Sequence, residues 1–469
     1  MLFNSYIFIL AFLPLTLFMY YRLNRWSHRA AEMGLIAASF IFYGYRHVLF
    51  VPLLAASIIV NYSLSCYMGR RNAPYRKGAL AIGSIFNFGL IFYFKYFNFF
   101  INNVNLVLSQ DIAVKKIILP LGISFFTFQQ ISYLIDSYEG KTREYDFIEY
   151  ALFVCFFPQL VAGPIVLHSE MIPQFRDANK KNVDYENIAR GIIRFSIGLA
   201  KKVLIADTFS IVVNYGFEHY LTDTPIDVIV TMLAYTFQIY FDFSGYCDMA
   251  LGIAKMFNIT LSENFNSPYK AISINDFWRR WHITLTRFLR KYIYYPLGGS
   301  RKGTLRTYLN IMTVFIASGI WHGANWTFIL WGILHGLLCV ADRFANDKLS
   351  KLPKIIQWGG TFTVVNVLWL LFRADSVSQW LTMLNNLCVN RSFTMTPEFR
   401  WIFETQLIKN HVFVAGVIFL IGFIGCLFFE NNGRRIWRAT GKTLTLAVTL
   451  MIWCILSLSG ISEFLYFNF

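Results

Sequence analysis

The chain has 469 residues, of which 56% are hydrophobic and only 14% are charged. Soluble domains carry about 25% charged residues, so this composition excludes a soluble fold and predicts an all-α polytopic membrane protein. The net charge of +16 indicates either basic cytoplasmic loops and anionic lipid contacts or a site for an anionic ligand. The basic residues lie in short loops between apolar runs, so nucleic acid is not an expected partner.

The first apolar segment, residues 1–21, carries no charge, and Arg22, Arg25 and Arg29 follow it. A cleavable signal peptide would place its positive charge before the apolar region and small residues at a cleavage site. We therefore expect a retained first span, with the N-terminus outside and residues 22–30 in the cytoplasm.

Apolar runs continue along the whole chain and predict about ten to twelve crossings within a single membrane domain, residues 1–469. The runs lie near 33–47, 49–68, 79–98, 117–135, 147–167, 192–213, 226–257, 308–321, 326–341, 358–372, 412–429 and 443–461. Several are shorter than the roughly 20 residues that a crossing helix needs. The proline-containing runs Leu119 to Phe125 and Phe157 to Pro164 predict re-entrant turns around a funnel or tunnel.

Basic clusters after several apolar runs predict which loops are cytoplasmic. They comprise Arg70, Arg71, Arg76 and Lys77, then Arg176, Lys180 and Lys181, and finally Arg434, Arg435, Arg438 and Lys442. The last cluster precedes the final apolar run, so the C-terminal tail, residues 462–469, is expected on the extracytoplasmic side. The seven cysteines show no CxxC spacing, which indicates packing residues and no metal site.

An amphipathic helix is predicted over about residues 275–292 at the cytoplasmic interface. Trp278 and Trp281 fall on its apolar face, Arg279 and Arg280 on the opposite face, and His282 at the edge. One interpretation is a membrane-surface anchor. The other is a basic wall that collects a phosphate-bearing donor, with His282 turned into the bundle.

His322 lies in an apolar stretch between two apolar helices, where Gly319, Gly323 and Asn325 predict a helix break. A broken helix inside a membrane is tolerated where it lines a cavity. A neutral imidazole there could act as a general base toward a hydroxyl. The alternative is a core histidine bonded to a backbone carbonyl that the break frees, and the residues alone leave both open.

Two further polar residues lie in apolar sequence. Asp242 shares a helix face with Gln238 and Gly245, which is typical of polar contacts between helices; a residue that orients a histidine, or part of a proton path, is the alternative. His335 follows His322 by 13 residues and would share its site only if the chain breaks between them, as the glycine-rich turn allows. The expectation for His335 is a structural role.

These motifs resemble the membrane-bound O-acyltransferase superfamily, especially the membrane subunit of bacterial alginate O-acetyltransferases. The matching pieces are the opening Phe-Asn-Ser-Tyr-Ile-Phe, Leu119 to Phe125, Phe157 to Pro164, Tyr240 to Asp248, Glu263 to Asn266, Phe277 to His282, Tyr295 to Gly299, Trp321 to Asn325 and the terminal Phe-Leu-Tyr-Phe-Asn-Phe. The two histidine motifs, 40 residues apart, are the most specific. The resemblance covers almost the whole chain.

The resemblance implies a helical bundle with broken helices around a funnel or tunnel, in the bacterial inner membrane. The family's catalytic histidine falls on His322 and its second histidine on His282. The donor would be a cytoplasmic thioester, acetyl-CoA, with no permanently bound cofactor. Donor-binding or supporting roles are expected for Trp278, Arg279, Arg280, Asp242 and Asn325.

The tail resembles an aromatic C-terminal motif of related acylation systems, which implies that Tyr466 accepts the acyl group and passes it on. The recipient would be an extracytoplasmic acetyltransferase partner resembling SGNH hydrolases, and an envelope polysaccharide the final acceptor. An interfacial aromatic anchor is the alternative for the tail. For the chain, a D-alanyl transferase fed by a carrier protein and a proton-coupled transporter are the alternatives.

Overall fold

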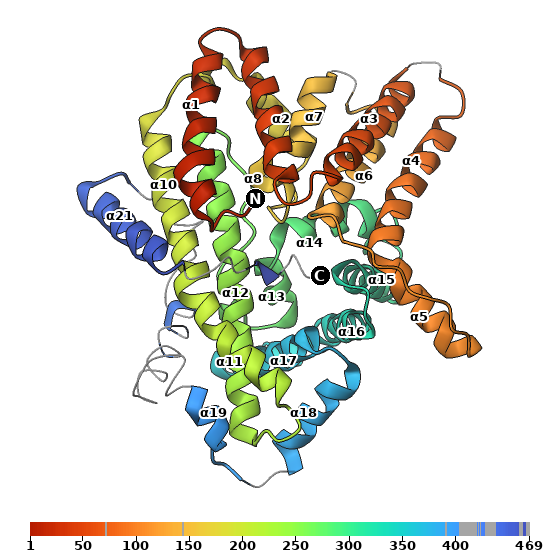
Figure 1. The fold of residues 1–469 in the computed structure, drawn as a ribbon. Coiled ribbons are helices and arrows are strands. Elements are labelled where there is room, and N and C mark those ends of the chain that lie inside the picture. The colour runs from red at the N-terminus through yellow and green to blue at the C-terminus, as the bar shows by residue number, and fades with distance from the viewer. Residues whose placement is uncertain are drawn as a thin grey trace. The chain divides into compact units, whose positions relative to one another are not determined.

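A computed structural model describes residues 1–70, 73–142, 145–389, 392–402, 420, 422, 424–426, 438–458 and 463–465. These residues form helices and irregular segments, with no strand, which confirms the predicted all-α class (Figure 1). Tyr466, most of the tail, and Arg434 and Arg435 of the last basic cluster lie outside the described residues.

The chain divides into two compact units. The single membrane domain predicted for residues 1–469 would comprise both of them. Unit 1 comprises residues 1–197, 246–262 and 437–468, and unit 2 comprises residues 198–245, 263–436 and 469. Two helices contribute to both units, namely α10 (Tyr185–Ala200) and α12 (Pro225–Met256).

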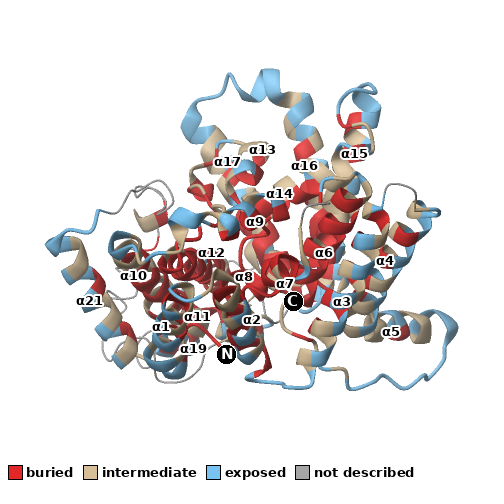
Figure 2. Ribbon diagram, turned by 90° about the horizontal axis from the view of Figure 1, so that it is seen from above, coloured by how far each residue is buried: buried red, intermediate tan, exposed pale blue. Residues whose placement is uncertain are grey.

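Unit 1 contains the N-terminal helices and α21. They are α1 (Leu13–Asn24), α2 (His28–Gly44), α3 (Phe50–Gly69), α4 (Arg76–Ile91), α5 (Phe97–Leu108), α6 (Ile123–Tyr138), α7 (Phe147–Cys155), α8 (Phe157–Leu160), α9 (His168–Arg176) and α21 (Gly441–Leu456). Helices α7 and α8 are deeply buried, because every residue from Glu149 to Cys155 and from Phe157 to Leu160 is covered, and α7 is largely red in Figure 2.

Unit 2 contains the segments that carry both histidine motifs. Its helices are α11 (Asp207–Glu218), α13 (Ile274–Arg280), α14 (Ile283–Leu289), α15 (Thr304–His322), α16 (Trp326–Leu349), α17 (Lys354–Arg373), α18 (Val377–Val389) and α19 (Pro397–Ile402). A π-helical turn, η4 (Lys201–Ala206), joins α10 to α11, and another, η6 (Arg290–Tyr294), follows α14.

Five described helical stretches are long and apolar enough to cross a membrane, and two shorter apolar helices accompany them. The five are Phe50–Gly69, Arg76–Leu108, Pro225–Met256, Trp326–Leu349 and Lys354–Arg373, and the shorter two are Phe8–Asn24 and Gly441–Leu456. Of the apolar runs behind the predicted ten to twelve crossings, several fold as short or interrupted helices, and the run 412–429 lies largely outside the described residues. The run 147–167, for example, becomes the nine residues of α7 and the four of α8.

The two predicted re-entrant turns meet inside unit 1. Gly122 adopts a φ of +71° just before α6, and a Cβ there would lie 2.6 Å from the Leu160 carbonyl oxygen at the end of α8. Only glycine combines that dihedral with so close a backbone approach. The glycine therefore allows close contact between two proline-containing turns whose contacting residues, Gly122 and Leu160, lie 38 residues apart in the sequence.

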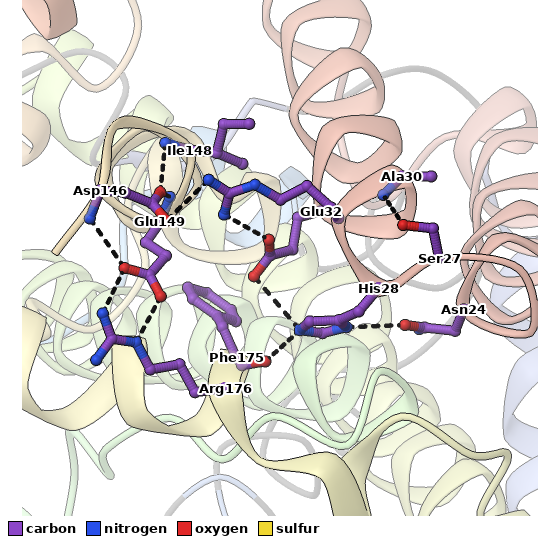
Figure 3. A network of polar contacts seen from close by, with 11 residues as sticks. Asn24, Ser27, His28, Ala30, Glu32, Asp146, Ile148, Glu149, Phe175 and Arg176 are labelled. Atoms are coloured by element: carbon purple, nitrogen blue, oxygen red, sulfur yellow. Dashed lines mark hydrogen bonds and ion pairs between the residues drawn. The ribbon is translucent and has the colours of Figure 1, made fainter.

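A polar network ties the ends of three helices at one end of unit 1 (Figure 3). Arg29 in α2 forms an ion pair of 2.8 Å with Asp146, whose side chain caps α7. Glu149, in the first turn of α7, accepts a hydrogen bond of 2.8 Å from Arg176 at the end of α9. The segment 22–30 and the basic cluster that begins at Arg176, both predicted to be cytoplasmic, therefore lie at the same end of unit 1.

Helices α15 and α16 form a tight hairpin in unit 2, with the predicted break between them. Helix α15 ends at His322, Gly323 is extended, and Asn325 caps α16 by accepting a hydrogen bond of 3.1 Å from the Thr327 amide. A Cβ on Gly323 would lie 2.1 Å from the Phe328 ring, so a side chain is excluded there. The predicted helix break at His322 is confirmed.

The predicted continuous helix over residues 275–292 is wrong at its centre. The segment folds as α13 and α14, with His282 in a left-handed conformation between them (φ 46°, ψ 51°). The tryptophans of its apolar face are buried, at 7% exposure for Trp278 and 1% for Trp281. They pack inside unit 2 instead of anchoring a membrane surface.

Candidate active site

His322 is the last residue of α15, and it is 3% exposed. Its Nδ1 lies 2.6 Å from the carbonyl oxygen of Ser318, one turn earlier. A carbonyl only accepts hydrogen bonds, so Nδ1 carries a proton, and Nε2 is the nitrogen that bears the lone pair in the neutral form of the ring. The backbone-carbonyl bond of the core-histidine interpretation is therefore present, and it makes Nε2 the nitrogen that could accept a proton in the catalytic interpretation.

His282 is fully buried, and Asn264 holds both its ring and its backbone. The Asn264 Oδ1 accepts from the Thr284 amide at 3.2 Å, which fixes the orientation of the side-chain amide. The same oxygen lies 3.2 Å from His282 Nδ1, so this histidine also carries its proton on Nδ1 and its lone pair on Nε2. The Asn264 carbonyl accepts from the Ile283 amide at 3.0 Å.

A left-handed conformation costs a residue with a side chain about 1–2 kcal/mol, and at His282 these bonds from Asn264 stabilise it. Sequence reasoning named the Glu263 to Asn266 segment as a motif but gave Asn264 no role. The available signal was the concentration of polar residues in the middle of an apolar chain.

An aromatic cluster brings the two histidines together. The Trp321 ring lies 6.1 Å from the His282 ring and 4.9 Å from the His322 ring, between centroids. Trp331 and Phe372 enclose His322 from α16 and α17, at 5.0 and 5.4 Å. Both imidazoles therefore sit among apolar rings, where a base is shielded from water.

Burial, and secondarily the positive form of His322, hold the pKa of the His282 imidazole well below its ordinary value of about 6.5. The unfolded chain protonates this group near pH 6.5, whereas the folded chain does not. Stability is therefore lost as the pH falls below about 6.5 toward the lower pKa of the folded chain.

We expect His282→Gln to remove this acid sensitivity, since glutamine can still donate to Asn264 but does not titrate. The measurement is the apparent Tm of both proteins in detergent from pH 8 to pH 5. The Tm difference between variant and wild type should move in favour of the variant as the pH falls. A difference that stays constant across this range would contradict the assignment of a neutral His282.

The ring of His335 lies 4.8 Å from the Trp331 indole, between centroids. The Trp278 Nε1–H donates to His335 Nδ1 at 3.2 Å. Since an indole only donates, Nδ1 is the acceptor, and His335 is the opposite tautomer from the other two histidines. This favours the structural role that the sequence predicts for His335, as a support for Trp278.

A cavity of about 230 Å³ lies beside this cluster in unit 2. Trp278 and Phe315 form part of its apolar wall, and Ser318, whose carbonyl orients His322, also lines it. Three guanidinium-bearing residues line it as well, namely Arg279, Arg290 and Arg343. The cavity therefore joins a basic rim to the residue that fixes the His322 tautomer.

Three other predicted residues have contacts within or between helices. Arg280 pairs with Asp276 at 2.9 Å, within α13. Asp242 forms an ion pair of 2.7 Å with the buried Lys202, which also pairs with Asp207 at 2.8 Å, so this triad links η4, α11 and α12. Asn325 caps α16 and donates to the Asp375 carbonyl at 2.9 Å.

Lys202 was missed by sequence reasoning. It stands beside Lys201, and a lysine pair in sequence gives no sign of which member is buried.

Comparison with known proteins places this chain in a family. The profile described as MBOAT, membrane-bound O-acyltransferase family, matches residues 90–378. The peptidoglycan O-acetyltransferase of Helicobacter pylori is 40% identical over 100% of this chain and 98% of its own length. A protein of Pseudomonas putida named probable alginate O-acetylase is 34% identical over 100% of both chains. The teichoic acid D-alanyltransferase of Bacillus subtilis is 26% identical over 50% of this chain and 62% of its own length.

The chain belongs to the membrane-bound O-acyltransferase family, which confirms the resemblance found in its motifs. It is a multi-pass membrane protein and an acyltransferase. This membership favours acyl transfer over the transporter alternative.

Proposed function

We propose that this acyltransferase takes an acetyl group from acetyl-CoA on the cytoplasmic side and passes it outward for O-acetylation of an envelope glycan. The observation that carries the proposal is the cavity with arginines at its rim and His322 anchored beside it. The full-length similarity to two proteins named for O-acetyl transfer supports acetyl over D-alanyl, because the D-alanyl transferase matches only half of the chain.

The cavity suits the end of a phosphate-bearing thioester. Guanidinium groups bind phosphate through paired, charge-assisted hydrogen bonds. The cavity lining contains three such groups, from Arg279, Arg290 and Arg343. At about 230 Å³ the cavity is smaller than a typical pocket for a whole ligand, which is about 300–1,000 Å³. It would hold the acyl-bearing arm, with the nucleotide part at the rim.

His322 would act as the general base. Its Nε2 takes the proton of the acceptor hydroxyl, the oxygen attacks the thioester carbonyl, and the carbon–sulfur bond breaks to release CoA. The imidazolium that forms shares its aromatic surroundings with His282. Because His282 is neutral at physiological pH, it adds no second positive charge beside that imidazolium.

The first acceptor would be the Tyr466 hydroxyl, which forms a phenyl ester and hands the acyl group to an extracytoplasmic, SGNH-hydrolase-like partner. Splitting one transfer into two is ordinary covalent catalysis, and a phenolate is a competent leaving group. Peptidoglycan is the first glycan to test, because the relative that is 40% identical is named for it.

The donor is tested with purified protein and two labelled thioesters, acetyl-CoA and a D-alanyl carrier protein. We expect CoA release and acyl transfer with the first only. Arg343→Gln and Arg279→Gln should each raise the KM for acetyl-CoA about tenfold, corresponding to about 1.4 kcal/mol. Lys348→Gln, an exposed residue outside the cavity lining on the same helix as Arg343, is the matched control. Transfer from the carrier protein, or equal effects at all three positions, would reject acetyl-CoA at this cavity.

A further inference from the structure

The described part of the C-terminal segment, Glu463 to Leu465, docks on unit 1. The Glu463 carboxylate forms an ion pair with the Arg46 guanidinium, which follows α2. The next residue, Phe464, is 1% exposed. Its ring packs edge-on against Tyr246 at 4.8 Å between centroids and 84° between planes.

The docking point lies at the end of unit 1 opposite the polar network of Figure 3. Helix α2 begins in that network at His28 and ends at Gly44, two residues before Arg46. Its 17 residues span about 25 Å, close to the roughly 30 Å of a bilayer core. Because the network end carries the basic clusters, Arg46 belongs to the end predicted to be extracytoplasmic.

Helix α21 leads the chain to the same end. It begins at Gly441, next to the last basic cluster, and ends at Leu456. The Tyr6 hydroxyl is within hydrogen-bonding distance of the Ile455 and Leu458 carbonyls, at 2.9 and 3.2 Å, beside that helix end. The chain thus arrives at the predicted outer end before it reaches Glu463.

The tail turns inward directly after Glu463, whose side chain is 35% exposed. The Tyr246 ring that covers Phe464 belongs to α12, ten residues before Met256, whose carbonyl accepts from Tyr21 in α1. Ten residues of helix correspond to about 15 Å, so Tyr246 lies within the thickness of unit 1. Phe464 is therefore an inserted side chain instead of a surface anchor.

The surface that receives Phe464 is itself fixed. The Tyr246 hydroxyl accepts a hydrogen bond of 3.3 Å from the Ala162 amide, in the turn after α8. The Tyr246 ring also stacks on Phe3 at 5.0 Å. A receptor held from two sides can fix the direction of a bound chain, because its own side chains have little freedom.

We propose that Arg46 and Tyr246 form a receptor for the C-terminal segment, the tail socket, and that it positions the tail for acyl transfer. Both are positioning residues. The inference rests on the proposed function in one respect, that Tyr466, two residues after Phe464, is the acyl acceptor. The ion pair between Arg46 and Glu463 fixes where the tail meets unit 1. The buried ring of Phe464 fixes how far the tail extends into it.

A charge exchange tests the socket. Arg46→Glu and Glu463→Arg should each lower polymer acetylation about fivefold or more, and the double variant should return to within about twofold of wild type. The KM for acetyl-CoA should not change, because the donor cavity is intact. Phe464→Ala should lower acetylation at least tenfold, and Phe464→Leu should retain most of it.

Carboxypeptidase digestion of the intact protein in membranes reports tail release independently of activity. Arg46→Glu should accelerate trimming of the tail, and the exchanged pair should slow it again. His47→Glu, at the exposed neighbour of Arg46, is the matched control for Arg46→Glu. If the exchange restores neither acetylation nor protection, the socket is wrong. If trimming follows the prediction but Tyr466→Phe is fully active, the relay fails and the socket stands.

Discussion

Replacing His322 by alanine is expected to lower acetyl transfer by about 10²- to 10⁴-fold, the range that a positioned general base contributes. The ring is anchored by the Ser318 carbonyl, which leaves Nε2 as the basic atom. Its surroundings of Trp321, Trp331 and Phe372 exclude water.

The His322→Gln variant separates basicity from anchoring. Its amide can still donate to Ser318, yet it has no nitrogen that accepts a proton at neutral pH. We expect it to be as inactive as His322→Ala, with wild-type yield in the membrane. His219→Ala is the control, because His219 is an exposed histidine of the same unit. Its ring stacks on Tyr215, with 4.0 Å between the centroids. Substantial transfer by His322→Gln would assign the residue a packing role.

The two histidine motifs show which features of this fold are readable from sequence. The break after His322 is local: Gly323 admits no side chain and Asn325 caps the next helix, and both signals stand in the sequence. The break at His282 is not local. The 3.6-residue periodicity of Trp278, Trp281 and Leu285 continues through it and predicts one helix.

The cause of the second break lies 18 residues upstream. The Ile283 amide, which in a continuous helix would bond to residue 279, instead donates to the Asn264 carbonyl. The Thr284 amide likewise donates to the Asn264 side chain. Tertiary partners thus take the donors that the helix needs, and a hydrophobic pattern contains no information about them.

The same distinction holds for the charged candidates. Arg279 and Arg280 are equivalent neighbours in the sequence, but Arg279 lines the cavity while Arg280 pairs with Asp276. Asp242 was readable as a buried carboxylate, whereas its partner Lys202 comes from another helix. Buried ions require such partners, so the sequence predicts that a partner exists but not which residue it is.

Replacing Tyr466 by phenylalanine is expected to reduce polymer acetylation at least 10²-fold while leaving the aromatic tail intact. The phenol, with a pKa near 10, needs a base to become a nucleophile, and the variant has no oxygen to acylate. With labelled acetyl-CoA, wild-type protein should retain label on its C-terminal peptide after denaturation, and the variant should not. Tyr185→Phe, at a tyrosine that is 80% exposed, is the matched control.

The value of this variant is that it separates two interpretations of one motif. An interfacial anchor depends on the aromatic ring, which phenylalanine keeps, so an anchor predicts full activity and no covalent label. A relay depends on the oxygen alone. Both the anchor and the relay depend on the docking of Phe464 against Tyr246. Phe464→Ala should therefore impair the tail under either interpretation. Only a loss at Tyr466→Phe together with loss of the labelled peptide identifies the hydroxyl as the acyl acceptor.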